Sequence, residues 1–91
     1  MEASDFEFEM AEGYVIGDAG PHGSLYGVSR GGRYVGEFPE MSDVIKWIAA
    51  DMNKSRYWPG VFYVNDHGNV SLLSIFRRGR GYSYRTVESW V

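Results

Sequence analysis

The chain has 91 residues, no cysteine and a formal net charge of −3. This length fits one domain with a modest core, and the lack of cysteine excludes disulfides, thiolate chemistry and cysteine-based metal sites. No apolar run approaches the ~20 residues that a membrane span needs, and the N-terminus lacks the basic and apolar regions of a secretory signal. We therefore expect a single soluble domain, residues 1–91, located in the cytoplasm and not in a membrane.

Charge is distributed unevenly along the chain. All the acidic residues of the first part precede the first basic residue, Arg30; they are Glu2, Asp5, Glu7, Glu9, Glu12 and Asp18. Near the other end, four arginines occur with no acid among them: Arg77, Arg78, Arg80 and Arg85. The two ends either attract each other across a sheet or form two faces offered to different partners.

The first part of the chain predicts strands and turns. Residues 5–10 alternate acids with Phe6, Phe8 and Met10, which is typical of a half-buried strand. After Gly13, residues 14–16 continue that strand past a bulge or begin a second one, and residues 18–24 have the composition of a loop.

A hairpin and the one convincing helix follow. Gly31-Gly32 separates two β-prone runs, residues 25–29 and 34–38, and two glycines suit a tight primed turn. The helix is expected within residues 38–53, with Ser42 as its N-cap. Its apolar residues recur every three or four positions, as one helix face requires: Val44, Ile45, Trp47, Ile48 and Met52.

The last part again alternates strands and turns. Residues 61–65 and 70–76 are expected to form a hairpin around the turn at 66–69, and a glycine-rich turn at 77–81 leads to a last strand at 82–87. The sequence thus predicts an α+β domain: an antiparallel sheet of five or six strands packed on a single helix, in the order β-β-β-α-β-β-β. Either the sheet curls around the helix, or one face stays open.

The sequence contains no clear pattern for a catalytic or metal-binding site. The only histidines, His22 and His67, fall in expected turns, and Asp66 beside His67 is better explained by turn chemistry than by a catalytic pair. A metal site needs three or four converging ligands. We expect no enzyme activity, no metal and no cofactor.

Two stretches are candidate protein-contact surfaces. The acidic row Asp5, Glu7 and Glu9 resembles a line of phosphates, although a charged edge strand kept soluble has the same pattern. In the loop Arg56-Tyr57-Trp58, large rings beside Pro59 and Gly60 suit an interface hot spot, unless Trp58 folds back onto the core.

The arginine-rich turn is the alternative site. It combines cations with rings, as single-strand nucleic-acid binders do, in residues Arg77, Arg78, Arg80, Tyr82, Tyr84 and Arg85. The other interpretation is a solvated hairpin turn whose arginines pair with local carboxylates or keep an edge strand soluble. The net negative charge of the chain also disfavours binding to phosphates.

The stretch from Gly36 to Leu73 adds a resemblance. G-E-F, then W-I-A-A-D-M, then Y-W-P-G-V-F-Y-V-N-D-H-G-N-V-S-L-L resembles small accessory proteins encoded by phages and other mobile elements, of which anti-CRISPR proteins are the best-known kind. The match covers under half the chain and carries over no catalytic residue. It implies a factor that binds and blocks a host complex.

We therefore expect a small non-enzymatic binding protein that occludes a surface on a nucleic-acid-handling protein complex of the host. The alternative is a nucleic-acid-binding module that uses the arginine turn. A third hypothesis is a structural protein that dimerises through a sheet face or edge, so the chain is expected to be a monomer or a homodimer.

Overall fold

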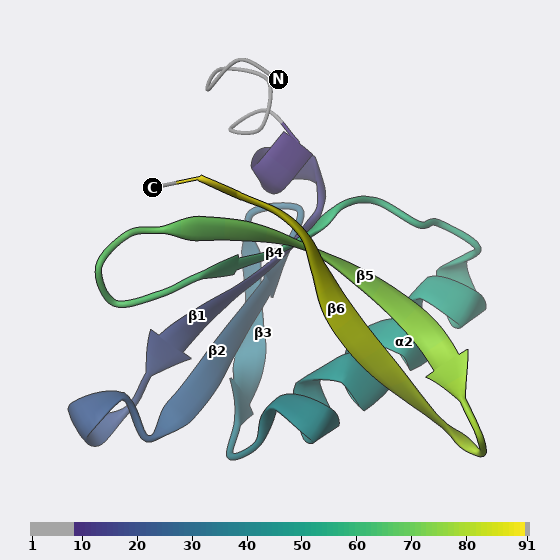
Figure 1. The fold of residues 1–91 in the computed structure, drawn as a ribbon, viewed down its shortest axis with the longest axis horizontal. Helices are drawn as coiled ribbons and strands as arrows, with labels where there is room; N and C mark the ends of the chain where they lie inside the picture. Colours follow the sequence, from purple (N-terminus) through teal and green to yellow (C-terminus); the bar gives the residue numbers. More distant parts are fainter. Residues whose placement is uncertain (1–8, 91) are drawn as a thin grey trace.

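The computed structural model describes residues 9–90. A helical turn at 9–12 precedes the main elements (Figure 1). These are β1 (Tyr14–Ala19), the short 3-10 turn η1 (Pro21–Gly23), β2 (Leu25–Arg30), β3 (Arg33–Phe38), α2 (Met41–Ser55), β4 (Val61–Val64), β5 (Val70–Arg78) and β6 (Gly81–Trp90). The predicted α+β architecture, with six strands and one main helix in the order β-β-β-α-β-β-β, is confirmed.

The strands form one sheet in the order β3-β2-β1-β4-β5-β6. Strands joined by short turns pair antiparallel, as expected. The central pair is parallel: Tyr14 of β1 lies opposite Val61 of β4. A parallel neighbour needs a crossover connection, and α2 lies between these halves of the chain. The sheet is therefore mixed, with two antiparallel halves joined by one parallel pair.

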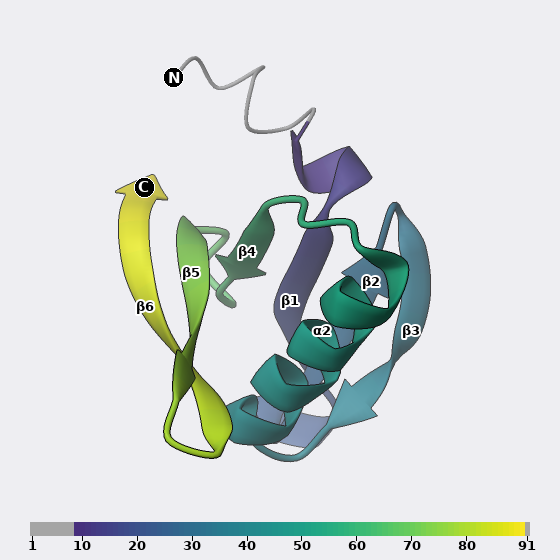
Figure 2. The same cartoon turned by 90° about the vertical axis from the view of Figure 1, so that its right-hand side faces the viewer.

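The helix packs in the hollow of the sheet. Figure 2 shows α2 between the β2–β3 side and the β5–β6 side, and β2, β3 and β6 contact it. The sheet thus curls around α2. The buried helix face consists of Val44, Ile45, Ile48, Ala49 and Met52, which confirms the predicted periodicity.

Trp47 lies at the margin of this core. Its side chain is half-buried, with its ring centroid 6.3 Å from that of Tyr14 in an edge-on arrangement and 6.3 Å from that of Phe38. Tyr14, Ile16 and Val28 are fully buried beneath the helix. They form one hydrophobic cluster with Val44, Ile48 and Met52 of α2, so the core lies between the helix and the central strands.

The predicted N-cap is wrong. Glu40 occupies the cap position with an extended backbone, and no side chain caps the helix. The carbonyl of Glu40 accepts bonds from the amides of Asp43 and Val44 at 3.1 and 3.3 Å. Ser42 therefore already lies inside the first turn, where its hydroxyl donates to Glu40 Oε2 at 3.5 Å.

The predicted first strand, residues 5–10, is wrong where the structure describes it. Residues 5–8 lie outside the described part of the chain, but Glu9 and Met10 are helical. The amide of Gly13 donates to the carbonyl of Glu9 at 2.9 Å and so closes the helical turn. The first strand begins at Tyr14 and runs to Ala19, because Asp18 and Ala19 pair with β2 and do not form a loop.

The structure contains the glycine turns that the sequence predicts between strands. Gly31 and Gly32 both have positive φ, 56° and 78°, as a primed hairpin turn requires. Gly68 takes φ 82° in the turn at 66–69, where Asn65 Oδ1 accepts bonds from the amides of His67 and Asn69, both at 2.9 Å. These turns are confirmed.

The last hairpin is longer than predicted. β5 and β6 continue until Arg78 pairs with Gly81, which leaves only Gly79 and Arg80 in the turn. Arg77 therefore belongs to a strand, as Arg78 does, and the two side chains point to opposite faces of the sheet.

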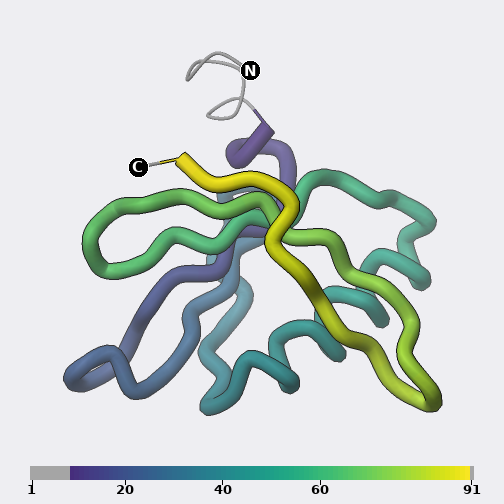
Figure 3. Tube along the Cα trace, in the orientation of Figure 1, coloured from purple at the N-terminus to yellow at the C-terminus, as the bar shows by residue number. Residues whose placement is uncertain are grey.

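Both edge strands contain a bulge. In β3 the register shifts so that Val35 has no partner, and in β6 a similar shift leaves Val87 without one. Both valines are exposed, by 39% and 57%. Figure 3 shows the β5–β6 hairpin changing direction part-way along its length. Bulges at edges interrupt the regular ladder that another chain would need for pairing.

Candidate functional site

The loop between α2 and β4 begins with an unusual backbone conformation. Arg56 ends α2 in the left-handed region, with φ 55° and ψ 35°. This conformation is common at helix ends and turns the chain sharply, although a residue other than glycine adopts it rarely. Arg56 therefore fixes the direction in which Tyr57 and Trp58 leave the helix.

The other end of the loop is fixed to the start of β1. The carbonyl of Gly60 accepts a bond from the amide of Tyr14 at 2.9 Å. Gly13 packs so closely on this carbonyl that an added Cβ would collide with it. The carbonyl of Gly13 in turn accepts from the amide of Gly31 at 2.9 Å. The loop, the helical turn and the first hairpin thus meet at Gly13.

The two rings of the loop stay largely in solvent. Trp58 is 66% exposed and Tyr57 is 45% exposed. Of the two interpretations of Trp58 that the sequence allowed, folding back onto the core is wrong. The structure places this ring on the surface, on a loop whose two ends are fixed.

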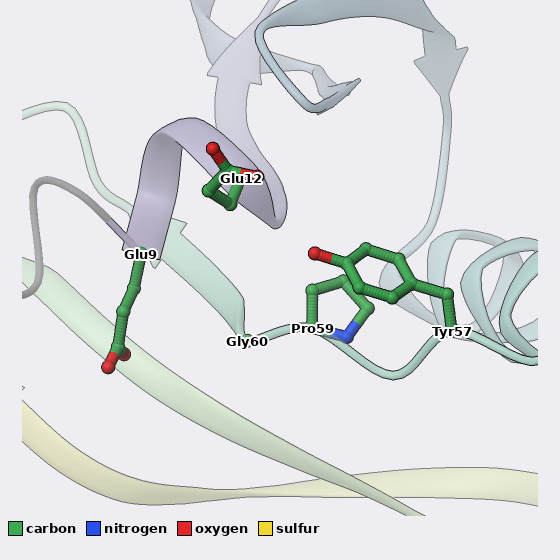
Figure 4. A pocket seen from close by; sticks show the side chains of 5 residues that line it. All are labelled: Glu9, Glu12, Tyr57, Pro59 and Gly60. Atoms are coloured by element: carbon green, nitrogen blue, oxygen red, sulfur yellow. The ribbon is translucent and has the colours of Figure 1, made fainter.

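A cavity of about 400 Å³ lies between the loop and the helical turn at 9–12 (Figure 4). It is lined by Glu9, Glu12, Tyr57, Pro59 and Gly60. The hydroxyl of Tyr57 points toward the helical turn, while the carboxylate of Glu9 points away from Tyr57. We refer to the loop at 56–60 and the turn at 9–12 together as the aromatic–acidic surface.

The structure joins only some of the predicted contact residues. Glu9 and Tyr57, from two separate candidate stretches, line the same cavity, and Arg56 and Trp58 flank Tyr57 in the loop. Asp5 and Glu7 lie outside the described residues. Glu12 was missed, because its spacing of three from Glu9 identifies a shared site only if this segment is helical.

The carboxylates of this surface form no ion pair with another residue of the described part of the chain. In residues 9–90, the close contacts between opposite charges are Arg30 with Asp51 at 3.1 Å and His67 with Asp66 at 3.7 Å. Neither contact joins the acidic start to the basic end. Within residues 9–90, no ion pair therefore holds the acidic start and the basic end together.

Neither histidine contributes to the cavity. His67 and Asp66 lie in the exposed turn at 66–69, with side chains 81% and 72% exposed, and His22 lies in η1. Over the described residues, no group of three or more His, Cys, Asp or Glu side chains is arranged to hold a metal ion.

The predicted arginine–tyrosine cluster is divided by the strands. The guanidinium of Arg77 lies 6.0 Å from the ring centroid of its cross-strand partner Tyr82. Tyr84 pairs with Ile75, which packs against the helix-side core. Arg85 pairs with Ser74 and, by strand alternation, lies on the opposite face. Arg78 shares that opposite face, and Arg80 occupies the turn.

The chain matches no family model, no curated protein and no solved structure. Among residues 9–90, no helix is both long and apolar enough to cross a membrane.

Proposed function

We propose that this chain is a small non-enzymatic binding protein that acts by covering a surface of a protein partner through its aromatic–acidic surface. The observation that carries the proposal is the 66% exposure of Trp58 beside the 45% exposed Tyr57, at the edge of a cavity lined by Glu9 and Glu12.

Exposed rings of this size favour binding. Tryptophan, tyrosine and arginine dominate interface energetics once a partner removes them from water, and Arg56, Tyr57 and Trp58 are consecutive. Binding also costs free energy when a mobile loop must be ordered. Arg56 and Gly60 fix the two ends of this loop, so that cost is reduced.

The carboxylates indicate the kind of partner. Glu9 and Glu12 form no ion pair with a described residue, so their charge is available to a basic surface. A partner with an apolar pocket for Trp58 and basic residues around it fits this pattern, and charge complementarity would speed the encounter. Asp5 and Glu7, outside the described residues, add negative charge in the same part of the sequence.

Nucleic-acid-handling proteins carry basic surfaces of this kind. This chemistry and the resemblance to phage accessory proteins together support a finer proposal, that the partner is a host nucleic-acid-handling complex and that binding occludes it.

The test is capture of the partner from a lysate of the native host with the tagged chain, followed by mass spectrometry. Trp58→Ala, and the charge reversal of Glu9 and Glu12 to lysine, should each abolish capture. Tyr34→Ala is the matched control, because Tyr34 is a ring of similar exposure, 59%, on another part of the molecule. If both site variants capture the same partner as the wild type, the proposed surface is wrong.

The alternative, a nucleic-acid-binding module, has less support, because strand alternation divides its arginines between two faces. It predicts a gel shift with single-stranded DNA that weakens steeply with salt. The shift should be lost when Arg77, Arg78 and Arg80 are replaced together.

A further inference from the structure

A second cavity lies at the opposite end of α2 from the aromatic–acidic surface. It has a volume of about 320 Å³ and is lined by Ser42, Lys46, Arg80, Gly81 and Tyr82. In Figure 2 the β5–β6 turn passes beside the first turns of α2, which explains how residues so distant in sequence share it. We refer to it as the basic cavity.

Two cations, Lys46 and Arg80, line the basic cavity. Neither Lys46 nor Arg80 forms an ion pair with a carboxylate of residues 9–90. Residues 67–87 contain no acidic residue. The nearest acids by sequence, Glu40 and Asp43, lie at the helix start but do not line the cavity. Two cations facing one hollow repel each other and attract an anion.

A hydrogen bond connects the phenol of Tyr82 to α2. Its oxygen accepts a bond from Asn53 Nδ2 at 3.0 Å, so its own hydrogen remains free for another acceptor. The Arg77 guanidinium on the ring, at 6.0 Å, fixes the same side chain and adds positive charge nearby.

The helix start adds weaker donors. α2 begins without a side-chain cap, and the uncapped amides of a first turn carry partial positive charge. Ser42 lies in that turn, and its hydroxyl donates to Glu40 Oε2 at 3.5 Å, so its only hydrogen is already directed to a carboxylate. Of the side chains that line the cavity, the ammonium of Lys46, the guanidinium of Arg80 and the phenol of Tyr82 therefore have hydrogens left to donate.

We propose that the basic cavity binds a phosphate group. A phosphate presents only acceptor oxygens, and it is recognised by arginine, lysine and helix-start amides together. The volume leaves room for part of the molecule that carries the phosphate. This site is separate from the proposed protein-binding surface and does not depend on it.

The first test is a titration with inorganic phosphate and pyrophosphate, monitored by the NMR amide shifts of Ser42 and Gly81. Chloride at matched ionic strength serves as the reference. We expect saturable shifts that the double variant Lys46→Ala/Arg80→Ala weakens by about tenfold or more, because each charge-assisted bond contributes substantially.

The matched control is Arg33→Ala/Lys54→Ala, which removes the same charge from exposed positions outside the cavity. It should bind phosphate as the wild type does. Equal weakening in both double variants, or shifts that never saturate, would overturn the proposal, since either would show general charge screening. Tyr82→Phe keeps the ring and should weaken binding less than the double variant does.

Two competitors then identify the source of the phosphate. If a single-stranded oligonucleotide displaces inorganic phosphate at lower concentration than a mononucleotide does, the cavity serves a nucleic-acid strand. If the mononucleotide competes as well, it serves small phosphorylated compounds. If neither competes, the site does not bind phosphate esters and the proposal fails. Trp58→Ala should leave all of these results unchanged.

Discussion

The phenol of Tyr14 donates a hydrogen bond to Asp51 Oδ2 at 2.5 Å and so joins β1 to α2. Arg30 Nε, from β2, lies 3.1 Å from the same oxygen, and its guanidinium lies 6.0 Å from the centre of the Tyr14 ring. One carboxylate thus connects two strands and the helix. Burial, and then the bond to Asp51, raises the pKa of Tyr14 to about 12.

This raised pKa predicts a loss of stability at alkaline pH. A phenol whose pKa is higher in the folded state contributes its full stability below its ordinary pKa of 10, and loses it as pH rises through about 12. Tyr14→Phe has no proton to lose, so its free energy of unfolding should fall less over that interval. Urea unfolding of both proteins, below pH 10 and near pH 12, measures the difference. At neutral pH the variant should be less stable by about 1.5 kcal/mol or more. Parallel decline of the two proteins would contradict this account.

The close packing at Gly13 predicts a large effect of one methyl group. Gly13→Ala should cost several kcal/mol, roughly at the upper end of single substitutions, because the new Cβ would collide with the Gly60 carbonyl. Gly36→Ala is the control, since no atom lies within 4 Å of the position of its Cβ. Thermal unfolding should show a much lower midpoint for the first variant only. A similar midpoint for both would mean that the loop is not fixed at Gly13.

The marginal position of Trp47 predicts a moderate loss of stability. A fully buried tryptophan replaced by alanine costs about 3–5 kcal/mol, but Trp47 is half-buried, so Trp47→Ala should cost less than that range. Ile48→Ala, at a fully buried position, should cost about 2–5 kcal/mol. Chemical denaturation of both variants gives the two values. A cost of about 3 kcal/mol or more for Trp47→Ala, which is the range of a fully buried tryptophan, would place the ring deeper than the structure does.

We expect the bulge in β6 to prevent this edge strand from pairing with another copy of the chain. Deleting Val87 removes the unpaired residue and should leave a regular edge strand, which another copy can pair with. Light scattering should therefore show that the average molar mass of the deletion variant rises more steeply with protein concentration than that of the wild type. Val87→Ala, which keeps the bulge, should behave as the wild type. If the deletion leaves the molar mass unchanged, the bulge does not protect this edge.

Local patterns predicted most of the fold. The spacing of Val44, Ile48 and Met52 identified the buried helix face, and Gly31-Gly32 identified the first hairpin. The alternation of residues 5–10 predicted a strand, but Glu9 and Met10 are helical. Glutamate, methionine and alanine also form helices well, and the bond from the Gly13 amide to the Glu9 carbonyl closes the helical turn. Pattern alone could not choose between the two structures.

The cavities could not be predicted in the same way. The turn at 9–12 meets the loop at 56–60 only because β1 and β4 pair in parallel, which places Tyr14 beside Val61. Likewise, Lys46 and Arg80 line one cavity only because β6 packs against α2, which brings the β5–β6 turn beside the helix (Figure 2). The sequence named some of the lining residues as candidates, among them Glu9, Tyr57 and Arg80, but not Glu12 or Lys46. Their grouping depends on the order of strands in the sheet, which local signals do not determine.

The most direct test of the proposed function is a calorimetric titration of the captured partner with the wild type, Trp58→Ala and Tyr34→Ala. A ring at the centre of an interface contributes about 2 kcal/mol or more, equivalent to roughly thirtyfold in Kd. Trp58→Ala should weaken binding by at least this factor, while Tyr34→Ala should leave Kd within about twofold of the wild type. Equal affinities for all three proteins would contradict the assignment of the aromatic–acidic surface.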